Sequence, residues 1–176
     1  MYIWIGVKVP RDFENDVRTH CLALNEKIEL DTTAFLLPQH ISLKISFETD
    51  RTDAVLEDLK TFVSEQNPFA VRLQSAQQMG NILWLPVADN DHLRHLHESL
   101  DARLESNFDI AQHKFDKEFL FHSTLFIDPD MEKVAKMAEV LANYPIEREL
   151  TVDTFLLGVS EQGKPGTYRV VSEIQI

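Results

Sequence analysis

Apolar residues recur along this chain with two periods, and each change of period predicts the end of one element and the start of another. Alternation from Tyr2 to Val9 predicts a strand, whereas spacings of three or four from Asp12 to Leu30 predict a helix. Glycine and proline mark further boundaries, as in the turn Gly163-Lys164-Pro165-Gly166. The same patterns predict further strands at about His40 to Phe47, Phe69 to Leu73, Ile82 to Val87, Phe119 to Ile127, Glu149 to Leu157 and Tyr168 to Ile176. They predict further helices at about Asp53 to Glu65, Asp91 to Leu104 and Met131 to Leu141.

The predicted order of strand, helix, strand, helix and strand occurs twice, and the second copy begins after Gly80. The first copy opens on Ile3-Trp4-Ile5 and the second on Leu83-Trp84-Leu85. The third element holds His40-Ile41-Ser42-Leu43 in one copy and His122-Ser123-Thr124-Leu125 in the other. This repetition indicates an internal duplication.

No linker rich in Pro, Gly or Ser separates the two copies, which predicts two lobes of one body rather than independent domains. We therefore predict an α+β fold in which residues 1–176 form a single domain. Lobe one is expected to span about residues 1–79 and lobe two about residues 80–176. Each lobe is expected to be a small antiparallel sheet with helices on its outer face, and the two pseudo-symmetric lobes are expected to surround a central cleft.

The two histidine motifs place similar chemistry on two strands. Alternate side chains of a strand share a face, so His40 lies beside Ser42 and His122 beside Thr124. One imidazole can accept a proton from an attacking water or hydroxyl while the other protonates the departing oxygen, and the hydroxyls can hold the non-bridging oxygens of a phosphodiester. Either histidine taken alone could also be an ordinary strand residue whose hydrogen-bonding groups are paired with a neighbouring residue. The occurrence of both in equivalent elements favours the catalytic interpretation.

In these motifs the chain resembles the two-histidine (2H) phosphoesterase superfamily, which has two His-x-Thr/Ser-apolar motifs on pseudo-symmetric lobes. It looks closest to the bacterial 2′,5′ RNA ligase and cyclic phosphodiesterase-like branch, because residues 80–85 and 152–176 also resemble strands of that branch. The resemblance implies that His40 and His122 are the acid/base pair and that Ser42 and Thr124 bind phosphate. It also implies that the reaction uses no metal and no cofactor.

Two positions depart from the family's pattern. Ser123 occupies a position that is usually apolar, so its hydroxyl lies on the core-facing side and needs a hydrogen-bond partner. The run Phe126-Ile127-Asp128 follows the second motif, where many relatives carry a basic residue. We therefore expect the substrate contacts on that side of the cleft to differ from those of the relatives.

Four further residues are candidates for binding the substrate. Lys44 has the strand parity of His40, so it either reaches a phosphate or faces solvent at a strand end. Trp4 and Trp84 either offer rings for a nucleobase to stack on or belong to the core. Tyr168 and Arg169 point to opposite faces of the last hairpin, and the resemblance favours Tyr168 as the residue in the cleft.

A group of three histidines, His92, His95 and His97, suggests a metal site at first sight, because histidines three positions apart share a helix face. The apolar stripe of the same helix leaves His92 and His95 at its edge, however, and the surrounding ligand set is poor. We expect these histidines to be solvated, and we expect no metal site. The stripe consists of Leu93, Leu96, Leu100 and Leu104.

Composition limits the partners. The 29 acidic residues outnumber the 17 basic ones and give a formal net charge of −12, which repels a long nucleic-acid duplex. The segment from Met1 to Pro10 lacks the features of a signal peptide, and no apolar run approaches the length of a membrane span. The single cysteine, Cys21, lies in a helical pattern and is expected to be a core residue. We expect a cytoplasmic monomer without a membrane partner.

We predict a phosphodiesterase that acts at a ribose 2′ position on a small nucleotide or an RNA end. It is expected to open a 2′,3′-cyclic phosphate, or to cleave or join a 2′,5′ linkage. A non-catalytic nucleotide or RNA-end binding protein with the same fold is the alternative, although binding alone needs no matched acid and base. The residues leave open whether the substrate is an RNA end, a 2′,5′ oligonucleotide, a cyclic oligonucleotide signal or a small cyclic phosphate.

Overall fold

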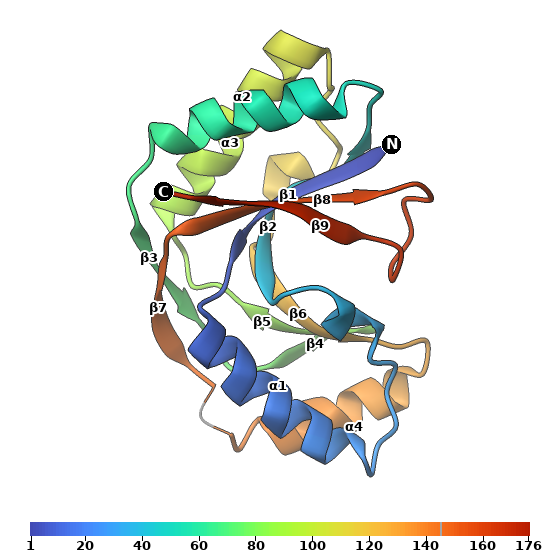
Figure 1. Cartoon of the computed structure of the whole chain (residues 1–176). Helices are drawn as coiled ribbons and strands as arrows, with labels where there is room; N and C mark the ends of the chain where they lie inside the picture. Colours follow the sequence, from blue (N-terminus) through green and yellow to red (C-terminus); the bar gives the residue numbers. More distant parts are fainter. Residues whose placement is uncertain (145) are drawn as a thin grey trace.

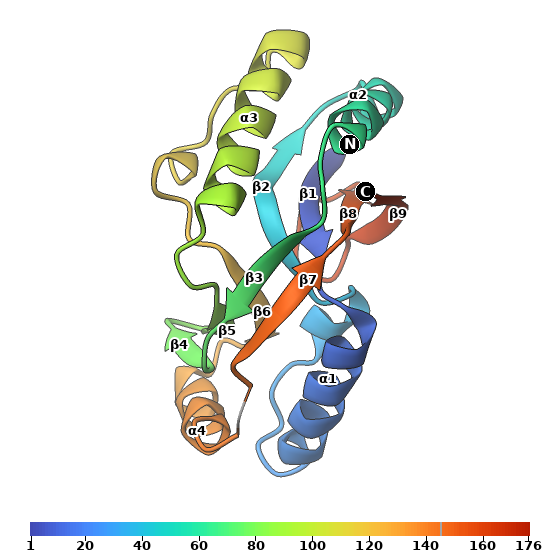
Figure 2. The same ribbon diagram turned by 90° about the vertical axis from the view of Figure 1, so that its left-hand side faces the viewer.

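Three antiparallel sheets form the frame of the molecule, whose computed structural model describes residues 1–144 and 146–176. The largest sheet has the strand order β2–β1–β8–β9, formed by His40–Glu48, Tyr2–Lys8, Thr154–Ser160 and Arg169–Gln175. A second sheet has the order β4–β5–β6, formed by Gln77–Met79, Ile82–Pro86 and His122–Ile127. The third is a ribbon of β3 (Phe69–Leu73) and β7 (Arg148–Val152) that runs beside the other two (Figure 2).

Four helices are described, together with two short 3₁₀ turns. The helices are α1 (Arg11–Asn25), α2 (Thr52–Ser64), α3 (Asp91–Phe108) and α4 (Met131–Leu141). The 3₁₀ turns are η1 (Thr33–Leu36) and η2 (Asp116–Glu118). Local capping fixes two of the starts, since the side chains of Asn90 and Asp130 accept backbone N–H bonds from the first turns of α3 and α4. This mixture of helices and antiparallel sheets confirms the predicted fold class.

The predicted division of the chain into lobes at residues 79 and 80 is wrong, because both halves contribute to both lobes. Strands β8 and β9 come from the second half, yet β8 pairs with β1. Helix α3 connects β5 to β6 of the smaller sheet but packs against β2 of the larger one. Helix α1 connects β1 to β2, yet it lies with α4 at the smaller sheet (Figures 1 and 2). The first connecting helix of each copy therefore covers the lobe of the other copy.

Among the predicted boundaries that differ from the structure, two have a clear local cause. The single strand predicted from Glu149 to Leu157 is broken at Asp153, whose carbonyl accepts the N–H of Ile176, and its two parts belong to different sheets. The helix predicted to reach Leu30 ends at Asn25. The Asn25 side chain bonds both the N–H and the C=O of Leu30, and Glu29 has a left-handed φ of 60° that no α-helix accommodates.

The core runs through both lobes without interruption. Buried residues of β1, β2 and β8 are continuous with those of β5 and β6, and with the apolar faces of the four helices. Cys21 is fully buried in this core, as predicted, and burial raises the pKa of its thiol to about 12. In the part of the chain that the structure describes, no helix is long and apolar enough to cross a membrane.

Candidate active site

The two histidine motifs lie on adjacent strands from different sheets and border one cavity. His40 begins β2 and His122 begins β6, and these two strands pack against each other. The cavity has a volume of about 940 Å³, and both histidines line it together with Ser42 and Thr124. Residues that are 82 positions apart in the sequence therefore meet as expected, with one imidazole and one hydroxyl from each motif.

The two imidazoles are held in the same way. Nδ1 of His40 lies 2.7 Å from the carbonyl oxygen of Pro38, and Nδ1 of His122 lies 2.6 Å from that of Leu120. A carbonyl oxygen only accepts, so in both rings Nδ1 carries the hydrogen and donates. In the neutral rings Nε2 is then the basic nitrogen, and it has no hydrogen-bond partner among residues 1–144 and 146–176. Each motif thus offers Nε2 for proton transfer.

Each histidine also rests on a tryptophan. The Trp4 and His40 rings stack with centroids 4.3 Å apart, and the Trp84 and His122 rings approach to 4.5 Å. Both indoles border the cavity, but only 6% of Trp4 and 9% of Trp84 is exposed. Of the two expected alternatives, a ring for base stacking or a core residue, the burial of both indoles favours the core, and a histidine covers one face of each ring. These contacts orient the imidazoles.

A glycine makes room for the first of these tryptophans. A Cβ atom at Gly158 would lie 2.6 Å from Nε1 of Trp4, which is closer than van der Waals contact allows. Gly158 lies on β8, directly opposite Trp4 of β1. The missing side chain lets the indole lie against the sheet beneath His40.

The hydroxyl groups of the cavity come from both lobes and from the last hairpin. Ser42 and Thr124 border the cavity as predicted, and so does Tyr168. The Tyr168 hydroxyl hydrogen-bonds the Ser46 hydroxyl on β2, which fixes the tyrosine ring at the cavity wall. The structure therefore places Tyr168 where the resemblance favoured it.

Lys44 does not reach out to a phosphate. Its side chain is 2% exposed, and its Nζ lies 2.7 Å from Asp101 Oδ1 and 2.5 Å from Asp116 Oδ2. The physical reason is a shift of register between β1 and β2, which pairs Ile5 with Lys44 but Gly6 with Ser42 and breaks the alternation of faces. The ammonium group is committed to two buried carboxylates, so the predicted phosphate contact is wrong.

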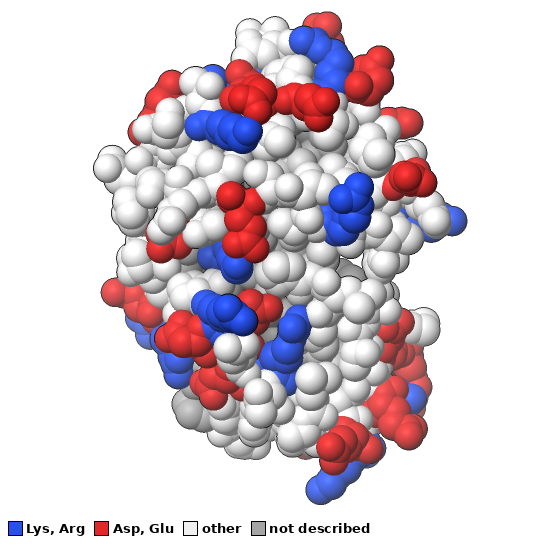
Figure 3. All heavy atoms as spheres, in the orientation of Figure 1, with Lys and Arg blue, Asp and Glu red and all other residues white. Residues whose placement is uncertain are grey.

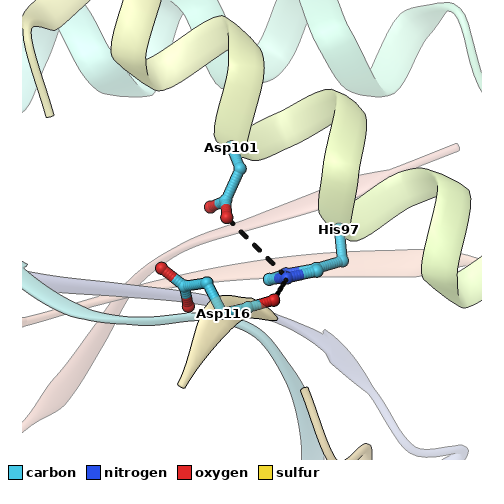
Figure 4. A group of neighbouring side chains, drawn as sticks. All are labelled: His97, Asp101 and Asp116. Atoms are coloured by element: carbon cyan, nitrogen blue, oxygen red, sulfur yellow. Dashed lines mark hydrogen bonds and ion pairs between the residues drawn. The ribbon is translucent and has the colours of Figure 1, made fainter. Parts of the chain in front are cut away.

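His97 belongs to the same buried cluster as Lys44, Asp101 and Asp116. This histidine is 3% exposed, with Nδ1 2.7 Å from the carbonyl oxygen of Leu43 and Nε2 2.9 Å from that of Asp116. Both ring nitrogens therefore lie within hydrogen-bonding distance of a backbone carbonyl oxygen, one on β2 and one on η2. Figure 4 shows the Asp101 carboxylate and the backbone carbonyl oxygen of Asp116 facing the His97 ring, and the three residues lie close enough together to hold a metal ion. Lys44 supplies the positive charge between the carboxylates, so an ion-pair network accounts for this group.

His92 and His95 are exposed, whereas Leu93, Leu96, Leu100 and Leu104 are buried, as the predicted apolar stripe of α3 requires. His97 alone departs from the expected solvated group. It lies on the buried face because it is four positions after Leu93 and three before Leu100. The same spacing was visible in the sequence and would have predicted its burial.

Ser123 has the partner that its core-facing hydroxyl requires. Ser123 Oγ donates to Oε1 of Gln39 at 2.7 Å, and both residues are buried. Gln39 precedes His40, so this bond ties the backbone beside one motif histidine to the backbone beside the other. Sequence reasoning did not single out Gln39, and only the need of Ser123 for an acceptor pointed to such a residue.

Replacing Ser123 with alanine is expected to lower the free energy of unfolding by about 1–3 kcal/mol, because the Gln39 carbonyl loses its buried donor. Urea denaturation followed by circular dichroism measures this loss. Ser64→Ala is the control, since that hydroxyl bonds a backbone carbonyl at an exposed helix end and its loss should matter little. Equal stabilities of the two variants would contradict the proposed link between the motifs.

Comparison with known proteins agrees with this geometry. A family model described as the 2′-5′ RNA ligase superfamily matches residues 15–164. A protein of Geobacillus thermodenitrificans, provisionally named a phosphoesterase, is 28% identical over 158 residues, which cover 85% of this chain and 81% of that protein. A Geobacillus kaustophilus protein with the same kind of name is 30% identical over 134 residues, covering 72% of this chain and 73% of the relative.

Solved structures share the fold across the whole chain. TT0787 of Thermus thermophilus superposes with a TM-score of 0.67 at 18% identity, covering 99% of this chain and 97% of that one. LigT of E. coli in complex with 3′-AMP superposes with a TM-score of 0.58 at 14% identity, covering 99% and 96%. The fold and the paired motifs define a phosphoesterase of the two-histidine class. The chain belongs to the 2′-5′ RNA ligase superfamily.

Proposed function

We propose that this protein is a metal-independent phosphodiesterase that acts at a ribose 2′ position, where it opens 2′,3′-cyclic phosphates or cleaves 2′,5′ linkages. One observation carries the proposal: in both motifs a backbone carbonyl holds Nδ1, which leaves two equivalent Nε2 atoms at one cavity. A binding protein needs no such matched pair. Proton transfer to and from one phosphodiester does.

The proposed reaction uses one histidine as base and the other as acid. A neutral imidazole accepts a proton at Nε2 from water as the water oxygen attacks phosphorus. The protonated imidazole of the other motif donates from Nε2 to the ribose oxygen that leaves, and the product is a ribose phosphate monoester. Ser42 and Thr124 donate hydrogen bonds to the non-bridging oxygens during the displacement. LigT of E. coli, which shares this fold, forms crystalline complexes with phosphate and with 3′-AMP, and this supports a nucleotide as the ligand of such a cavity.

A substrate panel tests the proposal. The protein is incubated in EDTA with 2′,3′-cyclic mononucleotides and with 2′,5′- and 3′,5′-linked dinucleotides, and mass spectrometry and NMR identify which hydroxyl carries the phosphate in each product. We expect turnover of at least one 2′ compound and none of the 3′,5′ dinucleotides. Turnover that disappears in EDTA and returns with zinc or manganese would refute metal independence. Binding without turnover would favour a nucleotide-binding protein.

The pH dependence provides a second test. Burial lowers the pKa of both histidines from the ordinary value, and the neighbouring His122 lowers that of His40 further, against the opposing effect of the carbonyl bonds. The productive state has one neutral and one protonated ring. It is therefore most populated between two apparent pKa values that both lie below the usual histidine value of about 6.5.

We expect kcat/KM to follow a bell with its maximum on the acid side of about pH 6.5, since this parameter reports the free enzyme. A bound phosphodiester anion favours the charged imidazoles and raises their pKa, so the maximum of kcat is expected at higher pH than that of kcat/KM. Steady-state rates between about pH 4 and pH 9 give both profiles. A kcat/KM that keeps rising above neutral pH would contradict the acid/base assignment.

A further inference from the structure

The lips of the cavity carry apolar side chains that are open to solvent. Leu36 on η1 is 70% exposed, and Phe115 and Leu120, on the segment before β6, are 59% and 62% exposed. All three line the cavity that holds the motif histidines. A cluster of large, solvent-exposed apolar side chains around a cleft is typical of a surface that binds an apolar group. Sequence analysis missed these residues, because isolated apolar positions in loops have no periodicity.

The same cavity offers no free cation to a second phosphate. Among the described residues that line it, Lys44 is the one lysine or arginine, and both of its neighbouring carboxylates neutralise it. Asp31 and Glu118 add negative charge to the lining, and hydrogen bonds from the side chain and the backbone N–H of Thr33 hold the pKa of the Asp31 carboxyl below its ordinary value. Lys114 lies over the Phe115 ring and is not part of the lining.

The cavity is also much larger than one phosphate. Its volume of about 940 Å³ is near the upper end of the ~300–1,000 Å³ of sites that enclose drug-sized ligands. A phosphate held by the two motifs would leave most of this space to the remainder of the substrate. The outer surface offers no alternative track for a phosphate chain on the face shown in Figure 3, where acidic and basic side chains are interspersed.

We infer that the substrate is a phosphodiester with a single negative charge, whose remaining bulk is uncharged and places an apolar face, such as that of a nucleobase ring, between Leu36, Phe115 and Leu120. A nucleoside cyclic phosphate without further phosphate groups has this chemistry, whereas an RNA end with upstream phosphates does not. The inference rests on the proposed function and narrows its substrate class.

Three probes separate charge from bulk: adenosine 2′,3′-cyclic phosphate, the same compound with a 5′-phosphate, and glycerol 1,2-cyclic phosphate. We expect the 5′-phosphate to lower kcat/KM by about tenfold or more, because its charges meet Asp31 and Glu118 without a cation. We expect a similar or larger loss for glycerol 1,2-cyclic phosphate, which has the same single charge as adenosine 2′,3′-cyclic phosphate but no base. The inference would be overturned if the 5′-phosphorylated compound had a kcat/KM equal to or higher than that of adenosine 2′,3′-cyclic phosphate.

Variants of the lips test the apolar contact. Phe115→Ser and Leu120→Ser are expected to raise KM for adenosine 2′,3′-cyclic phosphate severalfold with little change in kcat. The control is Met131→Ser, which removes a side chain that is 56% exposed on α4 and outside the cavity, and it should leave KM unchanged. An unchanged KM in both lip variants would contradict the assignment of these residues.

Binding measurements on an inactive variant test the substrate class independently of the proposed activity. Calorimetric titration of a His40→Ala/His122→Ala double variant with the three probes measures the preference without turnover. If the wild-type protein cleaves none of the probes but the double variant binds them in the expected order, the proposed activity fails and the substrate class stands. Tightest binding of the 5′-phosphorylated compound overturns the substrate class, whatever the activity.

Discussion

Replacing either His40 or His122 with alanine is expected to lower kcat/KM on the best substrate of the panel by about a hundredfold or more, which is the scale of one acid/base group. Each imidazole presents Nε2 to the cavity from the same carbonyl-anchored position, so neither can take over both proton transfers. Steady-state kinetics at the pH optimum of each variant measures the loss. Near wild-type activity in either variant would make the two-histidine assignment wrong.

Related variants sharpen this result. The double variant is expected to be little worse than the worse single variant, because residues that act as one unit are not additive. Ser42→Ala and Thr124→Ala should each cost less than either histidine change, since the remaining hydroxyl still holds the phosphate. His95→Ala is the matched control, because that histidine is exposed on α3 and lies outside the cavity. Its kcat/KM should equal that of the wild type.

Replacing Lys44 with methionine is expected to lower the free energy of unfolding by about 3–5 kcal/mol, the usual cost of removing one partner from a buried ion pair. The change leaves the Asp101 and Asp116 carboxylates buried near each other without the ammonium group that bridges them. Urea denaturation at neutral pH measures the loss.

Lys60→Met is the matched control for this change. The Lys60–Glu57 pair has the same 2.7 Å separation as the Lys44–Asp101 pair, but its side chains are 48% and 70% exposed. Solvent screens such a pair, so its removal should cost about 1 kcal/mol or less. A loss of similar size in both variants would mean that the Lys44 network adds nothing beyond a surface pair.

The histidine site could be predicted from sequence because each half of it is local and the two halves follow the same pattern. Parity within a strand puts His40 beside Ser42 and His122 beside Thr124, and the repeated order puts the two motifs at equivalent points. Lys44 has the same parity and was still misplaced. A register shift depends on how β2 pairs with β1, and the sequence of β2 alone does not contain that information.

The membership of the lobes could not be predicted for a related reason. Periodicity identifies the apolar face of a helix, as it did for α3, but not the sheet that this face will cover. The break at Asp153 was equally hidden, since apolar residues continue on both sides of it in β7 and β8. Which sheet a helix covers, and which strand a strand pairs with, depends on packing between residues far apart in the sequence. The pattern of a single sequence does not show these pairings.

The exchanged helices bear on how such a molecule could have arisen. Because α1 covers the sheet of the second copy and α3 covers that of the first, neither half of the chain encloses its own core. A half-length ancestor with the same contacts would have left one apolar face bare, and a second copy of itself would have filled the gap by a reciprocal swap. Fusion of two such genes would turn a helix exchange between two chains into a helix exchange within one chain. Fragments 1–79 and 80–176 should therefore fold together when co-expressed and aggregate when made separately.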